Sequence, residues 1–321
     1  PALVTAVAGA GGTGFLAAGY LAPDALAEQV EAVRDAGVDA FGVNVFVPGP
    51  PSDPDVAASH RLLLEAEAER YGTSVGAPTH DDDAWEAKID LLVEAAVPVV
   101  SFTFGCPDAA VLDRLRDVGS ATVVTVTTAE EAREAVERGA DGVCAQGVEA
   151  GGHQGSFDPL RGGGSPLREL LGNVVAAVDV PVIAAGGIMT GADVAGVLDA
   201  GAAAAQSGTA FLRCPESGAN PVHKAALADP AYTETAVTWA FTGRPARGLA
   251  NRFIAEHPRK PHAYPEIHHM TKPLRTAAAR AGDPGGMALW AGRGFRLATD
   301  APAAEVVERL RREAAEAGRK V

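Results

Sequence analysis

Short apolar runs alternate with amphipathic segments along most of the chain, and this alternation constrains the fold more than any other feature. The runs contain little period-two patterning, which is typical of strands buried on both faces. Segments between them place apolar residues on one helical face, as Leu26, Val30 and Val33 do. Alternating strands and helices predict a parallel sheet with helical crossovers. The candidate strands are residues 12–18, 40–47, 97–104, 122–127, 142–147, 181–187 and 202–212.

Seven candidate strands suit either an open doubly wound sheet or most of an eight-stranded barrel. The units repeat evenly, without the interruption that marks a switch point in an open sheet. Glycine-rich turns also follow the last two strands, where barrels commonly hold a phosphate. The sequence therefore predicts an α/β fold, a TIM (β/α)8 barrel whose first strand is apparently absent from this chain.

The alternating pattern ends near residue 214 and does not resume until about residue 291. The intervening residues are rich in Pro, Arg and His and have weak β character. We expect residues 214–291 to form a small, mainly helical appended domain that covers one end of the barrel. Residues 1–213 and 292–321 then form the barrel, closed by an amphipathic helix at 302–317.

Charge and cysteine content narrow the classes of function. The 321 residues include 41 acidic and 27 basic side chains, a net charge of −14, which argues against contact with nucleic acid or an anionic membrane. A local basic pocket for a small anion is compatible with this balance. Cys106, Cys144 and Cys214 are odd in number and far apart, so we expect reduced thiols in a cytoplasmic protein and no disulfide framework. No stretch of ~20 apolar residues is present to span a membrane.

Two glycine turns follow consecutive candidate strands. Gly186 and Gly187 end one strand, and Gly208 with Thr209 follows the next. Glycine lets backbone N–H groups approach a ligand closely, and a following helix favours an anion there. The pair predicts a phosphate or flavin-phosphate site. The alternative is a pair of tight packing turns.

Polar side chains at other strand ends are candidates for chemistry. His153 lies in the loop "QGVEAGGHQG", among glycines and directly after a strand, which favours a catalytic role over a structural one. Gln146 and Asn44 end two strands with amides that can pair with the N–H and C=O groups of a heterocycle. In the appended segment Tyr264, His268 and Lys272 recur every four residues, so one helical face could bind a small anion or simply face solvent.

A metal site is not expected. His257, His262, His268 and His269 include no HxxxH or HExxH pair, the spacings that zinc sites use.

Eight stretches of the sequence closely resemble the nitronate monooxygenases, formerly called 2-nitropropane dioxygenases. The resemblance is carried by "GAGGTGFLAAGYL", "FGVNVFVP", "VSFTFGCP", "AQGVEAGGHQG", "VPVIAAGGI", "QSGTAFL", "TGRPARGLANRF" and "LWAGRG", along nearly the whole chain. It implies FMN as cofactor, no metal, and oxidation of a small anionic nitronate by O2 to a carbonyl compound and nitrite. Propionate 3-nitronate is one such substrate.

The resemblance also implies roles for individual residues. His153 matches the family's active-site histidine, and Asn44, Gln146 and Gly151 match positions near the flavin ring or ribityl chain. Tyr264, His268 and Lys272 resemble substrate-facing side chains, although His268 stands where an aromatic hydroxyl is expected. Positions that match the ribityl- and phosphate-binding turns are Gly186, Gly187, Gln206, Ser207, Gly208 and Thr209.

One departure from the family concerns the beginning of the chain. Family members start with a strand and loop resembling "PIIQAPMAG", whereas this chain opens in the following helix. We expect a fragment of a longer chain, and a gapped barrel with weakened FMN binding is the alternative. Other hypotheses are an NAD(P)H-dependent FMN reductase of quinones or enoyl thioesters, and a flavin-binding protein without turnover. A homodimer is compatible with the sequence, which leaves the oligomeric state open.

Overall fold

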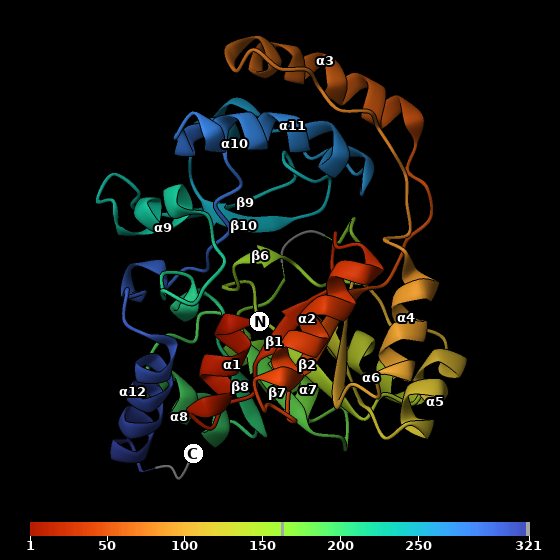
Figure 1. Cartoon of the computed structure of the whole chain (residues 1–321), viewed down its shortest axis with the longest axis vertical. Helices are drawn as coiled ribbons and strands as arrows, with labels where there is room; N and C mark the ends of the chain where they lie inside the picture. Colours follow the sequence, from red (N-terminus) through yellow and green to blue (C-terminus); the bar gives the residue numbers. More distant parts are fainter. Residues whose placement is uncertain (162–163, 319–321) are drawn as a thin grey trace.

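All seven predicted strands form, in a single parallel sheet. The computed structural model describes residues 1–161 and 164–318, and within them the sheet has the strand order β1-β2-β3-β4-β5-β7-β8. The sheet curls with helices around its outer face (Figure 1), which is the architecture of a TIM barrel. Strands β1 and β8 are its two edges. The strands are β1 (Phe15–Ala17), β2 (Gly42–Phe46), β3 (Val99–Thr103), β4 (Ala121–Val126), β5 (Gly142–Gln146), β7 (Val182–Ala185) and β8 (Ala204–Gln206).

Amphipathic helices cover the sheet as the periodicity predicts. Leu26, Val30 and Val33 are all buried, on the inner face of α2. The closing helix expected near 302–317 is α12, which packs against α8 and α1. The barrel helices are α1 (Ala2–Gly9), α2 (Pro23–Asp35), α4 (Trp85–Glu94), α5 (Ala109–Asp117), α6 (Ala129–Glu137), α7 (Leu167–Val175), α8 (Gly191–Asp199) and α12 (Ala303–Glu316), with 3-10 turns η1 (Thr209–Phe211) and η3 (Phe295–Leu297).

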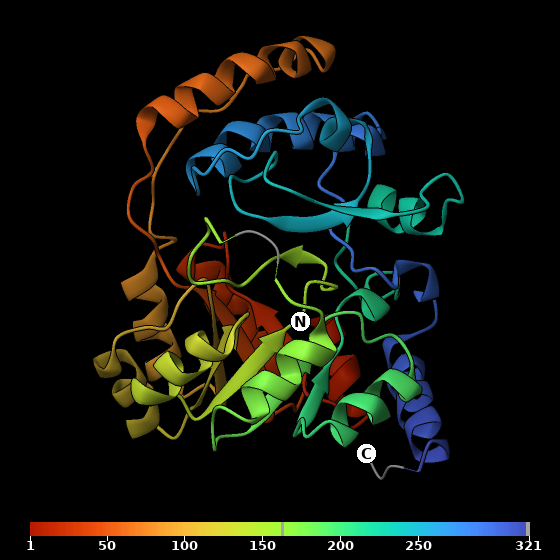
Figure 2. The ribbon, with the colours of Figure 1, turned by 180° about the vertical axis from the view of Figure 1, so that it is seen from behind.

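The segment between the last barrel strand and α12 forms a cap over the carboxyl ends of the strands (Figures 1 and 2). Helices predominate in it, but it also contributes two strands to an antiparallel sheet of order β6-β10-β9. The sequence did not show this sheet, because its strands are only two to four residues long and β6 comes from the loop that carries His153. The elements are β6 (Gly152–His153), α9 (Pro221–Ala228), β9 (Thr235–Thr238), β10 (Ala246–Leu249), α10 (Arg252–Glu256), α11 (Glu266–Arg280) and η2 (Pro284–Gly286).

A helix from the first part of the chain also packs on the cap. Helix α3 (Pro54–Arg70) lies across α11, and its Leu64 shares a second hydrophobic core with Phe241, Phe253 and Ile267. The division predicted at residue 214 is therefore incomplete as a description of packing. We propose that α3 be counted with the cap, so that the chain enters the cap twice.

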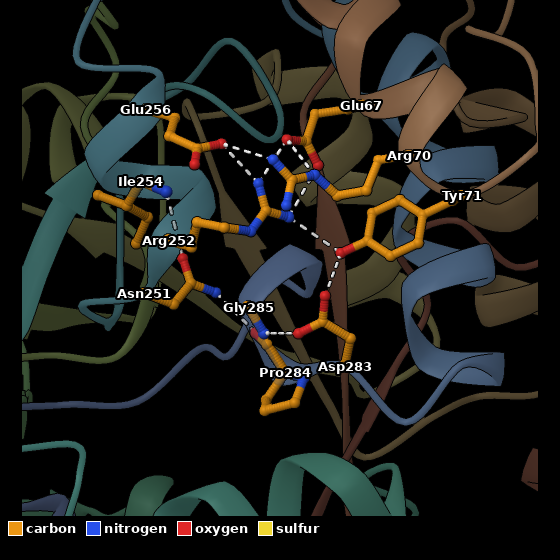
Figure 3. Close-up of polar contacts among 10 residues, drawn as sticks. All are labelled: Glu67, Arg70, Tyr71, Asn251, Arg252, Ile254, Glu256, Asp283, Pro284 and Gly285. Atoms are coloured by element: carbon orange, nitrogen blue, oxygen red, sulfur yellow. Dashed lines mark hydrogen bonds and ion pairs between the residues drawn. The ribbon is translucent and has the colours of Figure 1, made fainter.

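A polar network fixes α3 to the cap (Figure 3). The Arg252 guanidinium donates to both carboxylate oxygens of Glu67, at 2.9 Å for Nη2 and Oε2. It also donates to the Tyr71 hydroxyl at 2.9 Å, and that hydroxyl donates to Asp283. Glu67 is buried, so this pair joins two segments far apart in the sequence through a desolvated ion pair.

Among the described residues, no helix has both the length and the apolar character needed to cross a membrane.

Candidate active site

A glycine-lined cavity opens at the carboxyl ends of β5, β7 and β8. Its volume is about 250 Å³. Of the predicted cofactor residues, it is lined by Gln146, Gly151, Gly186, Gly187, Gln206, Gly208 and Thr209. Gly152, Gly292 and Gly294 line it as well, so bare backbone forms a large part of the wall. The structure thus brings most of the predicted residues to one place.

Two of these glycines are needed for clear geometric reasons. A Cβ on Gly151 would lie 2.5 Å from the backbone of Ala291 and Gly292, so any side chain would push apart the two segments that form the wall. Gly186 has φ +113°, a conformation that residues with a Cβ rarely adopt. Glycines that line the cavity are therefore also needed for close packing, as the packing-turn alternative expects.

The cavity suits an anionic group of a cofactor. In the described part of the chain, the N–H groups of Gly187 and Gly208 donate to no protein acceptor. A Cβ built on Gly208 meets nothing within 4 Å, so open space lies at this point of the wall. Unpaired N–H groups around an open cradle are the donor set that binds phosphate in other proteins. The residues present fit the phosphate-bearing part of a flavin cofactor.

Hydroxyls beside the cavity hold its two turns in place. Ser207 Oγ donates to the carbonyl of Ile188 and so links the turn after β8 to the turn after β7. Thr209 Oγ1 accepts from the N–H of Gly292 at 3.0 Å. Both side chains therefore fasten the walls, and Thr209 also lines the cavity.

The two predicted amides also bond to protein groups. Gln146 donates to the carbonyl of His153 at 3.1 Å and accepts from the N–H of Gly155 at 2.7 Å. Its place at the end of β5 therefore fixes the loop that carries the histidine. Asn44 Oδ1 accepts from Ser101 and Thr103 at 2.9 and 3.0 Å, which leaves its NH2 group as the part available to a ligand.

A second cavity of about 240 Å³ lies on the other side of Gln146. Thr127, Gln154, Ser156 and Arg161 are among the residues that line it. Glu131 supports this region by accepting from the Thr127 N–H and the Phe157 N–H, at 2.6 and 3.0 Å. Thr128 caps α6 by accepting from the Glu131 N–H, and the Glu131 carboxylate links the start of α6 to the loop after β6.

His153 lies in an aromatic enclosure above the strand ends. Its ring centroid is 5.5 Å from that of Phe104, 5.6 Å from Trp290 and 6.0 Å from Tyr264. Its Nε2 lies 3.0 Å from Thr242 Oγ1. Barrel, loop and cap therefore all contribute to the surroundings of this one imidazole.

The histidine is neutral in this enclosure. Burial lowers the pKa of His153 to about 3, with the nearby charges of Arg244 and Arg275 acting in the same direction. A neutral imidazole offers one N–H donor and one lone pair. It can therefore polarise an oxygen of a bound substrate, but it carries no charge to attract an anion.

The predicted stripe on the cap is only partly brought to the site. Tyr264 precedes α11 and donates from its hydroxyl to that of Tyr20 at 3.0 Å. His268 is buried and stacks on the Tyr20 ring at 3.8 Å, and burial lowers its pKa to about 2. Lys272 is exposed on α11. The three residues do not form one anion-binding face, because Tyr264 lies outside the helix and the helix turns Lys272 to solvent.

Several residues around His153 had no role assigned from the sequence. Tyr20 supplies a hydroxyl beside His268, Thr242 contacts the imidazole, and Arg244 and Arg275 supply the buried positive charge. The segment "TGRPARG" contributed to the family resemblance and contains Thr242 and Arg244. Only the folded cap shows that its arginine at 244 faces the aromatic enclosure.

Among the described residues, no cluster of three or more His, Cys, Asp or Glu side chains is placed to hold a metal ion. Polar chemistry at the site therefore comes from the imidazole, the tyrosines, the arginines and the backbone N–H groups described above.

The fold and the site together define a TIM-barrel protein whose strand ends carry a glycine-lined cavity with unpaired N–H groups. The family model described as nitronate monooxygenase matches residues 1–313. A probable nitronate monooxygenase of Bacillus subtilis (strain 168) is 37% identical over 308 residues, covering 94% of this chain and 88% of the relative. One from Staphylococcus aureus (strain JH9) is 35% identical over 324 residues, covering 97% and 89%.

Solved structures are similar to the chain as well. The nitroalkane oxidase from Streptomyces ansochromogenes is 52% identical with a TM-score of 0.96, covering 99% of this chain and 92% of that one. FabK from Thermotoga maritima is 27% identical with a TM-score of 0.75, covering 99% and 89%. The chain belongs to the nitronate monooxygenase family. It is accordingly a flavin-dependent oxidoreductase.

Proposed function

We propose that the enzyme oxidises alkyl nitronates, such as propionate 3-nitronate, with O2 to a carbonyl compound and nitrite, and that its flavin is FMN. The observation that carries the proposal is the neutral imidazole of His153, enclosed by aromatic rings next to the glycine-lined cavity. Membership in the family supports the reaction class. The 52% identity to a nitroalkane oxidase supports a nitro compound or its anion as substrate.

The proposed cofactor site uses the turns after β7 and β8. The N–H groups of Gly187 and Gly208 would bind the phosphate, and Gly151 would let the His153 loop lie close to the ring. Asn44 would offer its free NH2 group from the end of β2. When bound, FMN supplies the electron acceptor of the reaction.

His153 would act on the nitro group of the substrate. The imidazole donates from one ring nitrogen to a nitronate oxygen, and the Thr242 hydroxyl on Nε2 keeps the ring oriented. Phe104, Trp290 and Tyr264 exclude water from the same space, which strengthens that hydrogen bond. If a neutral nitroalkane is the substrate, the other tautomer, in which Nε2 donates to Thr242, would leave the lone pair of Nδ1 to accept its proton.

Nitrite release from propionate 3-nitronate tests this function. We expect the wild-type enzyme to release nitrite, and His153→Asn to do so about 100-fold more slowly while still containing flavin. Flavin content and Tm of the variant are the controls for folding. Equal turnover by the flavin-loaded variant would remove His153 from the mechanism.

An NAD(P)H-dependent reductase of quinones or enoyl thioesters is the second candidate. The likeness to FabK from Thermotoga maritima, at 27% identity, is the reason to test it. Rapid anaerobic reduction of the flavin by NADH would favour this candidate. A yellow protein that reacts with neither NADH nor a nitronate would indicate flavin binding without turnover.

A further inference from the structure

Two arginines in the site lack an acidic partner. Arg244 is only 6% exposed, and its Nη2 donates to the carbonyl of Ser156 at 2.6 Å. Its Nε is buried and has no hydrogen-bond partner within the described residues. Arg275 donates to the Thr271 hydroxyl and to the carbonyl of His268, at 3.1 and 3.0 Å. All these acceptors are neutral.

Arg252, in the network that joins α3 to the cap, is an example of an arginine in this chain whose charge is paired for a structural purpose. Arg252 meets two carboxylates, Glu67 and Glu256, as well as the Tyr71 hydroxyl (Figure 3). Arg247 is buried in β10 and also has partners on two nitrogens, Val148 and Thr235. A buried guanidinium with an unpaired donor and no carboxylate in direct contact is costly unless an anion binds it.

Arg244 lies against the aromatic rings that enclose His153. Its guanidinium lies 4.1 Å from the centroid of the Phe104 ring and 5.7 Å from that of Tyr264. Both rings belong to the enclosure around His153. A small molecule that contacts the imidazole within this enclosure therefore lies within reach of the positive charge.

We propose that Arg244 binds the anionic oxygen of the nitronate and sets the preference of the enzyme for nitronate anions over neutral nitroalkanes. Arg275 strengthens the positive potential from the cap side. The inference rests on the proposed function for the identity of the substrate. It also accounts for how a chain of net charge −14 attracts an anion, since Lys272 is exposed and His153 is neutral.

Arg244→Met tests this role by removing the charge and keeping the length of the side chain. We expect KM for the nitronate to rise about 10- to 100-fold, the effect of one charge-assisted hydrogen bond, and KM for the neutral nitroalkane to change little. Nitrate is an unreactive planar anion and serves as a probe of binding alone. Its Kd for the flavin-loaded enzyme, measured by calorimetry, should rise by the same factor.

Matched variants separate charge from folding. Arg244→Gln is the second variant, for use if Arg244→Met fails to fold. It removes the charge but retains an amide donor for the Ser156 carbonyl, and it should show the same losses of affinity. Arg252→Met removes a positive charge from the cap but lies in the α3 network, so it should lower Tm and leave nitrate affinity unchanged.

Two results would overturn the assignment. One is the absence of nitrate binding by the wild-type enzyme, and the other is unchanged nitrate affinity in a folded Arg244 variant. If the wild type oxidises no nitronate, the proposed function fails, and the nitrate titration still decides whether Arg244 forms an anion site.

Discussion

At the residue scale, different residues position the backbone of the His153 loop and the imidazole of His153. Gln146 and Gly151 bring the loop close to the strand ends, while Thr242 and the aromatic rings define the surroundings of the imidazole. The glycines and the histidine could be recognised from the sequence, because their spacing follows directly from the strand. Thr242 and Arg244 could not, because they reach the site only through the folding of the cap.

Gly208 provides a residue-level test of the cofactor site. A leucine at this position would extend into the open space at the cavity wall, where a Cβ meets nothing within 4 Å. We expect Gly208→Leu to raise the Kd for the flavin at least about tenfold, because one lost or blocked contact of about 1.4 kcal/mol has that effect, and so to lower the flavin content of the purified enzyme.

Gly196→Leu is the matched control for this change. Gly196 lies in α8 and also has open space around its Cβ position, but it does not line the cavity. Its variant should retain wild-type flavin content. Full flavin content in a folded Gly208→Leu enzyme would argue against the predicted phosphate cradle.

At the element scale, the barrel was predictable and the cap largely was not. Buried parallel strands are continuous apolar runs, so all seven were visible in the sequence, as was the amphipathic helix α12. The cap sheet depends on pairing between β6 and β10, which are separated by about ninety residues and have no periodicity of their own. The packing of α3 on α11 is likewise a long-range contact that no local pattern encodes.

The network in Figure 3 predicts how firmly α3 is attached to the cap. Glu67→Gln removes the charge of a buried carboxylate and leaves the Arg252 guanidinium without its bidentate partner. Breaking a buried pair in this way should lower the free energy of unfolding by about 3 kcal/mol, measured by urea denaturation. Glu69→Gln, on an exposed side of the same helix, should change it by less than about 0.5 kcal/mol.

At the scale of the whole molecule, buried neutral histidines make the fold sensitive to acid. Burial lowers the pKa of His60 and of His223 to about 4, and His153 and His268 are shifted further. Below pH ~6.5 the unfolded chain binds these protons and the folded chain does not, so each histidine costs about 1.4 kcal/mol per pH unit until its folded pKa is reached. The stability is thus fully present above pH ~6.5 and lost as the pH falls.

Thermal unfolding between about pH 7.5 and pH 5 checks this dependence. Tm should fall with pH across this window, and His60→Gln should fall less steeply because one titrating group is removed. A Tm that stays constant over the window would mean that these histidines titrate alike in the folded and unfolded chain.

In the proposed reaction the barrel binds the flavin at the glycine turns and His153 acts on the nitronate. Flavin absorbance under anaerobic conditions tests this most directly. Purified, FMN-loaded enzyme is mixed with propionate 3-nitronate or with NADH in the absence of O2. We predict that the nitronate bleaches the flavin band, that NADH does not, and that admitting air restores the band with release of nitrite. Bleaching by NADH alone, or by neither compound, would contradict the account.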